Sequence, residues 1–176
     1  MRIAVILTLA LCALSAGSMA DKPRVNRPMI EAMEHSLDRK LAGLWPADPV
    51  EMVGPTQGAY VEGVGAVFMG EVNVAPAAGL TPFHPSVTPD EIRRIRDKKV
   101  QRMAQLRTAM REMLVDSARS LDAVPADEQV AVGVSLFYWK WENREGLPAQ
   151  IVMHAPRKAL LESASAAQAP IAAQEF

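Results

Sequence analysis

A long amphipathic helix over residues 88–121 constrains the fold of this chain more than any other feature. Thr88-Pro89-Asp90-Glu91 has the sequence of a capping box, with proline at the first helical position and acidic side chains in the first turn. Apolar side chains then recur every three or four residues and form one stripe, which comprises Ile92, Ile95, Met103, Leu106, Met110, Met113, Leu114 and Leu121. At 1.5 Å per residue the helix is roughly 50 Å long, so we expect it to cover a small sheet and extend past one end of it.

Segments with the composition of strands lie on both sides of this helix. Residues 60–74 are rich in β-branched and aromatic side chains, and Gly63 and Gly65 indicate a bulge, a bend or a tight hairpin within them. Residues 129–141 alternate large and small side chains, which predicts a strand with one face on a core. Residues 149–154 follow a charged turn, and we expect them to pair with that strand as a hairpin.

The remaining segments supply two further helices and the domain boundaries. Residues 29–44 place apolar side chains at helical spacing, and residues 156–166 have the length of a short helix. Residues 163–176 are rich in alanine and have no packing pattern, so we expect a disordered tail. The sequence therefore predicts a single α+β domain over residues 21–162, in which a small antiparallel sheet packs against one long amphipathic helix.

The first 20 residues have the features of a cleavable secretory signal peptide. Arg2 supplies the positive charge, and an almost unbroken apolar run follows it over residues 3–14. Ser18 and Ala20 are the small side chains that signal peptidase needs before a cut at Asp21. The apolar run is too short for a membrane span, which takes about 20 residues.

Cleavage at that position would also remove Cys12, which is the only cysteine of the chain. A mature chain without cysteine has no disulfide, no thiolate nucleophile and no cysteine metal site. We therefore expect an exported bacterial protein, periplasmic or extracellular, without a transmembrane span in its mature form and stabilised by burial alone.

The run Tyr60-Val61-Glu62-Gly63-Val64-Gly65-Ala66-Val67-Phe68, with Glu71-Val72 and the later Pro125-Ala126-Asp127-Glu128, resembles a group of uncharacterised secreted bacterial proteins. The resemblance covers residues 60–161 and rests on short structural motifs. It implies a signal peptide, a glycine-punctuated aromatic strand, a central helix and a final hairpin. The resemblance implies no activity and assigns no functional residue.

Basic side chains are concentrated on the long helix. Between residues 92 and 111 there are eight lysines and arginines and one acid, Asp97, although the whole chain has a formal net charge of −1. That overall balance argues against a specific nucleic-acid binder. The helix face suits an envelope protein, a glycan or an anionic surface, or else is a solvated face, and its candidate binding residues are Arg93, Arg94, Lys98 and Arg102. Lys99 is an exception, because its position falls within the apolar stripe.

Two tryptophans near the end of the second predicted strand form the other candidate contact. Strand alternation places Trp139 and Trp141 on the face opposite Leu136 and Tyr138. If that face is open, the two indoles form an aromatic patch suited to a sugar or a protein. If the long helix or the tail covers it, they belong to the core.

Other motifs do not complete a catalytic or metal site. Gly63-x-Gly65 lacks the third glycine of a dinucleotide-binding fingerprint, and Ser135 lies within a strand instead of at a nucleophile elbow. Glu31 and His35 are one helical turn apart but lack the further ligands of a zinc or di-iron site. The sequence therefore predicts no metal and no cofactor.

Three functional hypotheses are compatible with these features. The favoured one is a non-enzymatic binding or interaction module of the cell envelope that uses the basic helix face and the two tryptophans. The first alternative is a small hydrolase or metal-dependent enzyme that uses Glu62, Glu71 and His154 as an acid–base group. The second alternative is a structural homo-oligomer, assembled through the end of the long helix that extends past the sheet.

Overall fold

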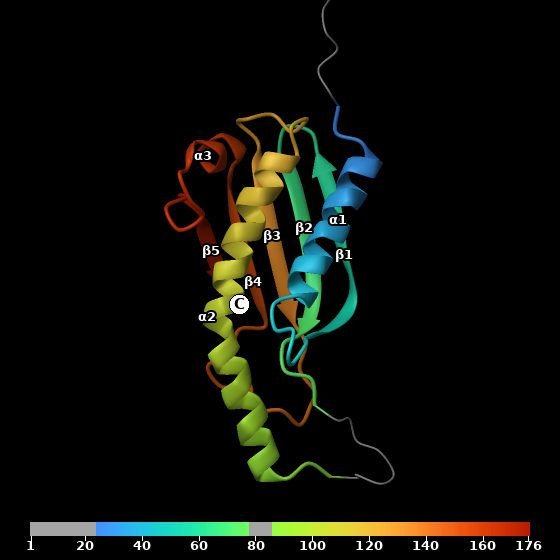
Figure 1. Ribbon diagram of the computed structural model, residues 1–176, viewed down its shortest axis with the longest axis vertical. Coiled ribbons are helices and arrows are strands. Elements are labelled where there is room, and N and C mark those ends of the chain that lie inside the picture. Colours follow the sequence, from blue (N-terminus) through green and yellow to red (C-terminus); the bar gives the residue numbers. More distant parts are fainter. Residues whose placement is uncertain (1–23, 78–85) are drawn as a thin grey trace, which may run out of the picture.

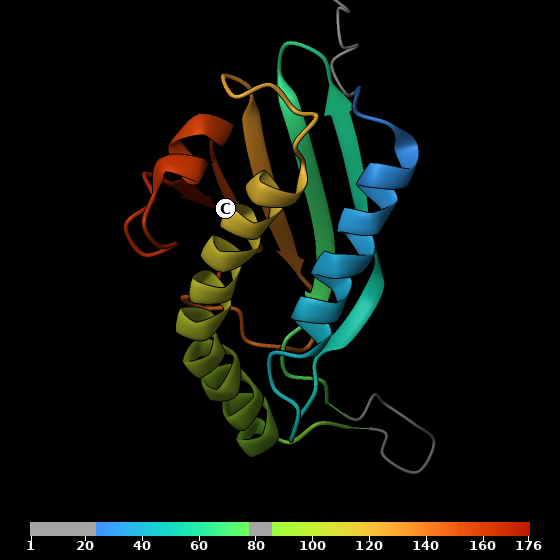
Figure 2. The ribbon, with the colours of Figure 1, turned by 45° about the horizontal axis from the view of Figure 1, so that its top comes forward.

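The computed structural model describes residues 24–77 and 86–176, so the predicted signal peptide lies outside the described residues. Figure 1 and Figure 2 show a sheet that has α1 and α2 on the same face. The elements, in chain order, are α1 (Arg27–Ala42), β1 (Glu51–Val61), β2 (Gly65–Asn73), α2 (Pro89–Ser120), β3 (Gln129–Leu136), β4 (Gln150–Pro156), α3 (Arg157–Glu162) and β5 (Ala172–Glu175).

The five strands follow each other across the sheet in chain order, β1-β2-β3-β4-β5. Three neighbouring pairs are antiparallel, whereas β2 and β3 run parallel. The parallel pair arises because α2 returns the chain to the start of the neighbouring strand as a crossover. The predicted α+β class, with a sheet packed on one long helix, is confirmed, and the sheet has this one parallel pair.

The long helix begins and ends as its sequence predicts. Thr88 Oγ1 accepts from the backbone N–H of Glu91 at 3.3 Å, and the Glu91 carboxylate accepts from the backbone N–H of Thr88 at 2.8 Å. This capping box satisfies two of the backbone groups that a helix start leaves open. The helix runs for 32 residues, and its N-terminal half extends beyond the strands (Figure 1).

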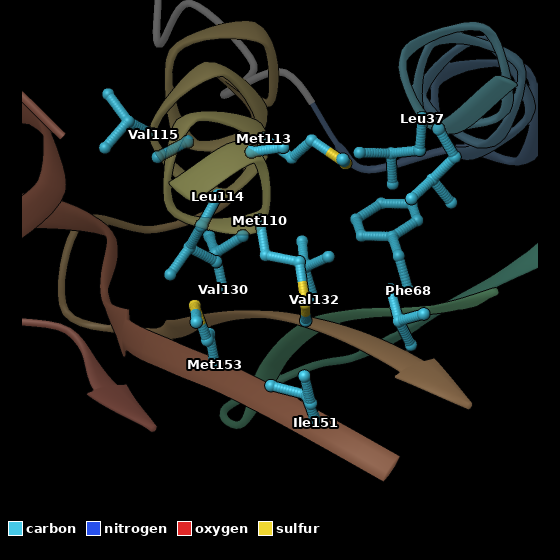
Figure 3. Close-up of a cluster of buried hydrophobic side chains, with 14 of the residues drawn as sticks. Leu37, Phe68, Met110, Met113, Leu114, Val115, Val130, Val132, Ile151 and Met153 are labelled. Carbon is cyan, nitrogen blue, oxygen red and sulfur yellow. The ribbon is translucent and has the colours of Figure 1, made fainter. Parts of the chain in front are cut away.

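The core lies between the sheet and the two long helices. Alternate residues of the central strands face the helices, among them Phe68, Val130, Val132 and Ile151, and all of them are buried. Figure 3 shows Leu114 and Met110 of α2 above these strands and Met113 directed toward Leu37 of α1. The methionines of the helix stripe are therefore core residues, consistent with the flexible thioether as a filler of irregular gaps.

Strand β1 begins nine residues earlier than the sequence indicates, because Gly54, Pro55 and Gly58 obscure its pattern. Its ladder with β2 is irregular between Met52 and Gln57. Carboxylates of α1 bind the backbone there: Asp38 accepts from the N–H of Thr56 at 2.9 Å and Glu34 from the N–H of Gly58 at 2.6 Å. These two acids of the helix therefore fasten α1 to the sheet.

The two glycines of the predicted strand form the tight β1–β2 hairpin. Gly63 has a φ of +79° within the turn, and Gly65 has a φ of +133° at the start of β2. A Cβ on Gly65 would lie 1.9 Å from the carbonyl oxygen of Gln129, so the neighbouring β3 backbone leaves no room for a side chain. Of the three sequence-based options, the hairpin is the one observed.

The expectation of a disordered tail over residues 163–176 is wrong for its last part. Ala172–Glu175 form β5, which pairs antiparallel with β4. The composition gave no sign of this strand, because all four side chains are exposed and its pairing with β4 runs through the backbone. A strand that buries no side chain leaves no hydrophobic pattern in the sequence.

Candidate functional site

The N-terminal half of α2 is supported by loops of the same chain, and its basic residues provide the contacts. Arg102 donates to the carbonyl oxygens of Val74 and Asp48 and to the Asp48 carboxylate, and its guanidinium lies 4.6 Å from the centre of the Trp45 ring. The side chain is only 7% exposed. The prediction that Arg102 belongs to an exposed basic face is therefore corrected, since it joins α2 to the loop before β1.

Lys99 and Glu142 form a second link between α2 and a loop, here the one between β3 and β4. Lys99 Nζ lies 2.6 Å from the Glu142 carboxylate and donates to the carbonyl of Phe137 at 3.0 Å. It also lies 4.4 Å from the centre of the Tyr138 ring. Burial lowers the pKa of Lys99, against the opposing effect of Glu142, and desolvation raises the pKa of Tyr138 to about 12. The position of Lys99 in the apolar stripe is explained by this buried pair.

Further basic side chains at the end of α2 that extends past the sheet contact other parts of the chain. Arg96 donates to the carbonyl of Glu145 at 3.2 Å, on the same loop that Lys99 holds. Lys98 forms an ion pair with Asp48, which holds the pKa of that carboxyl below its usual value, and the charge of Arg102 lowers it further. Arg93 is paired with Asp90 one turn away and remains largely exposed.

A pocket of about 280 Å³ lies between this part of α2, the β3–β4 loop and described residues that connect β2 to α2. Three of the sequence-predicted residues line it: Arg94 and Lys98 from α2 and Trp141 from the β3–β4 loop. The rest of the lining is mostly apolar and comprises Ala75, Pro76, Ala77, Val87, Ile95 and the charged Glu91. The pocket therefore has an indole and aliphatic walls, and the cationic side chains of Arg94 and Lys98 also line it.

The two predicted tryptophans do not form one patch. Strand β3 ends at Leu136, so the alternation assumed over residues 129–141 stops before either indole. Trp139 is 38% exposed and packs edge-on against Phe137, with ring centroids 5.1 Å apart. Trp141 is half-buried against α2 in the pocket. Only one of the two is therefore placed beside the basic residues.

The residues of the enzyme hypothesis lie apart. Glu71 of β2 is opposite Ser135 in the ladder, whereas His154 of β4 is opposite Ala131, four residues earlier in β3. Glu62 lies in the β1–β2 turn, at the other end of β2 from Glu71. Within residues 24–77 and 86–176, no group of three or more histidine, cysteine, aspartate or glutamate side chains has the geometry to hold a metal ion.

Sequence reasoning missed a buried carboxylate at the opposite end of the sheet. Glu128 is 8% exposed, and its Oε1 accepts from the N–H of Gly63 at 2.8 Å and from the hydroxyl of Tyr60 at 3.3 Å. Desolvation, reinforced by this carboxylate, raises the pKa of Tyr60. Next to Asp127, Glu128 has the local sequence of a surface loop, and no pattern in the chain indicated its role. It holds the β1–β2 turn against the start of β3.

Comparison with known proteins gave no match to a family model, to a curated protein or to a solved structure. In the part of the chain that the structure describes, no helix combines the length and apolarity that a bilayer crossing requires.

Proposed function

We propose that this protein is a binding module and that its ligand occupies the pocket lined by Arg94, Lys98 and Trp141. The observation that supports this most is the convergence of these side chains. They come from segments more than forty positions apart in the sequence and line one concave site with apolar walls. Pockets that combine apolar walls with a few convergent polar groups are the usual form of small-molecule sites.

The lining favours a ligand with a negative charge and an apolar or aromatic part. Arg94 is exposed and offers a planar guanidinium suited to a carboxylate, sulfonate or phosphate. Lys98 is already paired with Asp48, so it adds to the local field, whereas Arg94 forms no ion pair or side-chain hydrogen bond with another residue of 24–77 or 86–176. The Trp141 indole and the aliphatic walls suit the apolar part of such a ligand.

The first prediction concerns an anionic aromatic probe, 8-anilinonaphthalene-1-sulfonate. We expect Arg94→Ala and Trp141→Ala each to weaken its binding about fivefold or more. Arg94→Ala removes the guanidinium that binds the sulfonate, and Trp141→Ala removes the indole that contacts the aromatic rings. Titration by probe fluorescence measures the change, with thermal unfolding curves to show that the variants stay folded.

The chain offers a matched control for each variant. Arg93→Ala removes the neighbouring arginine, which is paired with Asp90, and Trp139→Ala removes the tryptophan that packs on Phe137. Both controls are expected to bind the probe within about twofold of the unaltered protein, since neither residue lines the pocket. Equal losses for Arg93→Ala and Arg94→Ala would contradict the proposed site.

We also propose that the module acts outside the cytoplasm, on the basis of the N-terminal 20 residues. Expression of the full sequence in a bacterial host is expected to yield a protein whose N-terminal residue is Asp21. Mass spectrometry of the cell-envelope fraction checks this, and a chain that keeps residues 1–20 in the cytosol would contradict it.

A further inference from the structure

The last residues of the chain occupy the edge of β4. The backbone N–H of Phe176 donates to the carbonyl of Gln150 at 3.0 Å, and the N–H of Gln150 donates to the carbonyl of Phe176 at 3.3 Å. The ladder continues from Ile151 opposite Glu175 to His154 opposite Ala172. Without β5, this edge of β4 would expose a row of backbone donors and acceptors, which is the template that an extended peptide requires.

Two arginines of α2 bind residues of the tail, residues 163–176, beside this edge. Arg107 holds the Glu175 carboxylate in a fork, with Nε 2.6 Å from one oxygen and Nη2 2.9 Å from the other. This fork lowers the pKa of Glu175. Arg111 donates to three carbonyl oxygens of the turn before the strand, those of Ala166, Ala167 and Ala169, at 2.9–3.3 Å.

Few side chains of the tail are buried. All four side chains of β5 are exposed, and Phe176 is exposed as well. Both partners of the Arg107–Glu175 pair are more than a third exposed, so the pair contributes modestly to stability, and a like charge at position 175 would add repulsion to the loss of the pair. Ala169 is the one fully buried residue of the described segment 163–176, and the half-buried Ala166 and Ile171 also pack against the core. The backbone ladder is independent of sequence, so other segments can make the same contacts.

We propose that the β4 edge, with Arg107 and Arg111, is a docking site for an extended acidic segment of a partner protein, and that the chain's own tail occupies it until that segment displaces it. The ladder supplies sequence-independent affinity, and the Arg107 fork selects a carboxylate at the position of Glu175. Arg111 binds carbonyl oxygens of the preceding turn, and the buried position of Ala169 selects a small side chain. The site is distinct from the ligand pocket at the N-terminal half of α2.

The test uses the full chain and a fluorescein-labelled peptide with the sequence of residues 166–176. In the unaltered protein the tethered tail competes at an effective concentration on the order of mM, so weak binding is expected. Glu175→Lys places a like charge opposite Arg107 and weakens the tail alone. The peptide is expected to bind this variant about tenfold more tightly than the unaltered protein, as measured by fluorescence anisotropy.

The matched control is Gln174→Lys, which introduces the same side chain one position earlier, away from Arg107. Its affinity for the peptide is expected to equal that of the unaltered protein. The milder Glu175→Gln variant is expected to give an intermediate affinity. A peptide with lysine in place of its glutamate is expected to bind the Glu175→Lys variant about tenfold more weakly than the acidic peptide.

Two outcomes would overturn the proposal. One is no binding of the acidic peptide to the Glu175→Lys variant at concentrations up to about 1 mM, or equal binding of the acidic and lysine peptides. The other is a dimer of the full chain in light scattering that the peptide does not dissociate, because the edge would then take the tail of a second copy. A monomeric complex with one peptide supports the proposal.

Discussion

Replacement of Lys99 by methionine is expected to lower the free energy of unfolding by about 3–5 kcal/mol, because it leaves the buried Glu142 carboxylate without its cationic partner. Both side chains are almost completely inaccessible to water, at 1% and 3% exposure. Methionine has a similar length and apolar character, so the lost charge is the main change. Denaturant titration measures the effect, which corresponds to a fall of roughly 6–20 °C in melting temperature for a domain of this size.

The double variant Lys99→Met/Glu142→Leu separates charge from packing. Replacement of both partners by apolar side chains removes the uncompensated charge, and stability is expected to return to within about 1 kcal/mol of the unaltered protein. A loss in Lys99→Met of less than about 1 kcal/mol would show that water or the backbone N–H of Trp139, which donates to Glu142 at 3.1 Å, compensates for the lost cation. The loop with Trp141 is fastened through this pair, so Lys99→Met is also expected to weaken probe binding in the pocket.

Local signals in the sequence predicted the elements that bury side chains. The capping box and the apolar stripe predicted α2 within one or two residues, because the cap is a local contact and the stripe follows the 3.6-residue period of the helix. The alternation of Val130, Val132 and Val134 predicted the core face of β3, because successive side chains of a strand point to opposite faces. The sequence did not predict β5, nor the first part of β1, since those strands are defined by backbone pairing and by carboxylates of α1.

The candidate site was predicted in part. Arg94, Lys98 and Trp141 were singled out from charge and aromatic character, and the structure places them around one pocket. Arg102 has the same local sequence environment as its neighbours, yet it is buried against Asp48 and Val74. Whether a basic side chain of α2 faces solvent or a loop depends on tertiary packing, which helical periodicity alone does not specify.

The second large effect is expected at Phe68. Its ring is fully buried and stands between β2 and α1 (Figure 3), where Gly58 and Ile30 border it. Phe68→Ala is expected to lower the free energy of unfolding by about 3–5 kcal/mol, because it removes the ring and leaves a cavity that the two rigid elements cannot close. Chemical denaturation followed by circular dichroism measures the loss.

Gly58 provides an internal check on that explanation. A Cβ at Gly58 would lie 2.7 Å from the Phe68 ring and 2.6 Å from Cγ2 of Ile30, so Gly58→Ala alone is expected to cost about 1–3 kcal/mol through overpacking. In the Phe68→Ala background the clash with the ring disappears and the new methyl group enters the cavity. The two changes should therefore couple by about 1 kcal/mol or more in a double-mutant cycle, in the direction of a smaller combined loss. Strictly additive losses would contradict this explanation. They would mean that the sheet and α1 move together and close the cavity when the ring is removed, so that β1, β2 and α1 do not hold a rigid arrangement at this point.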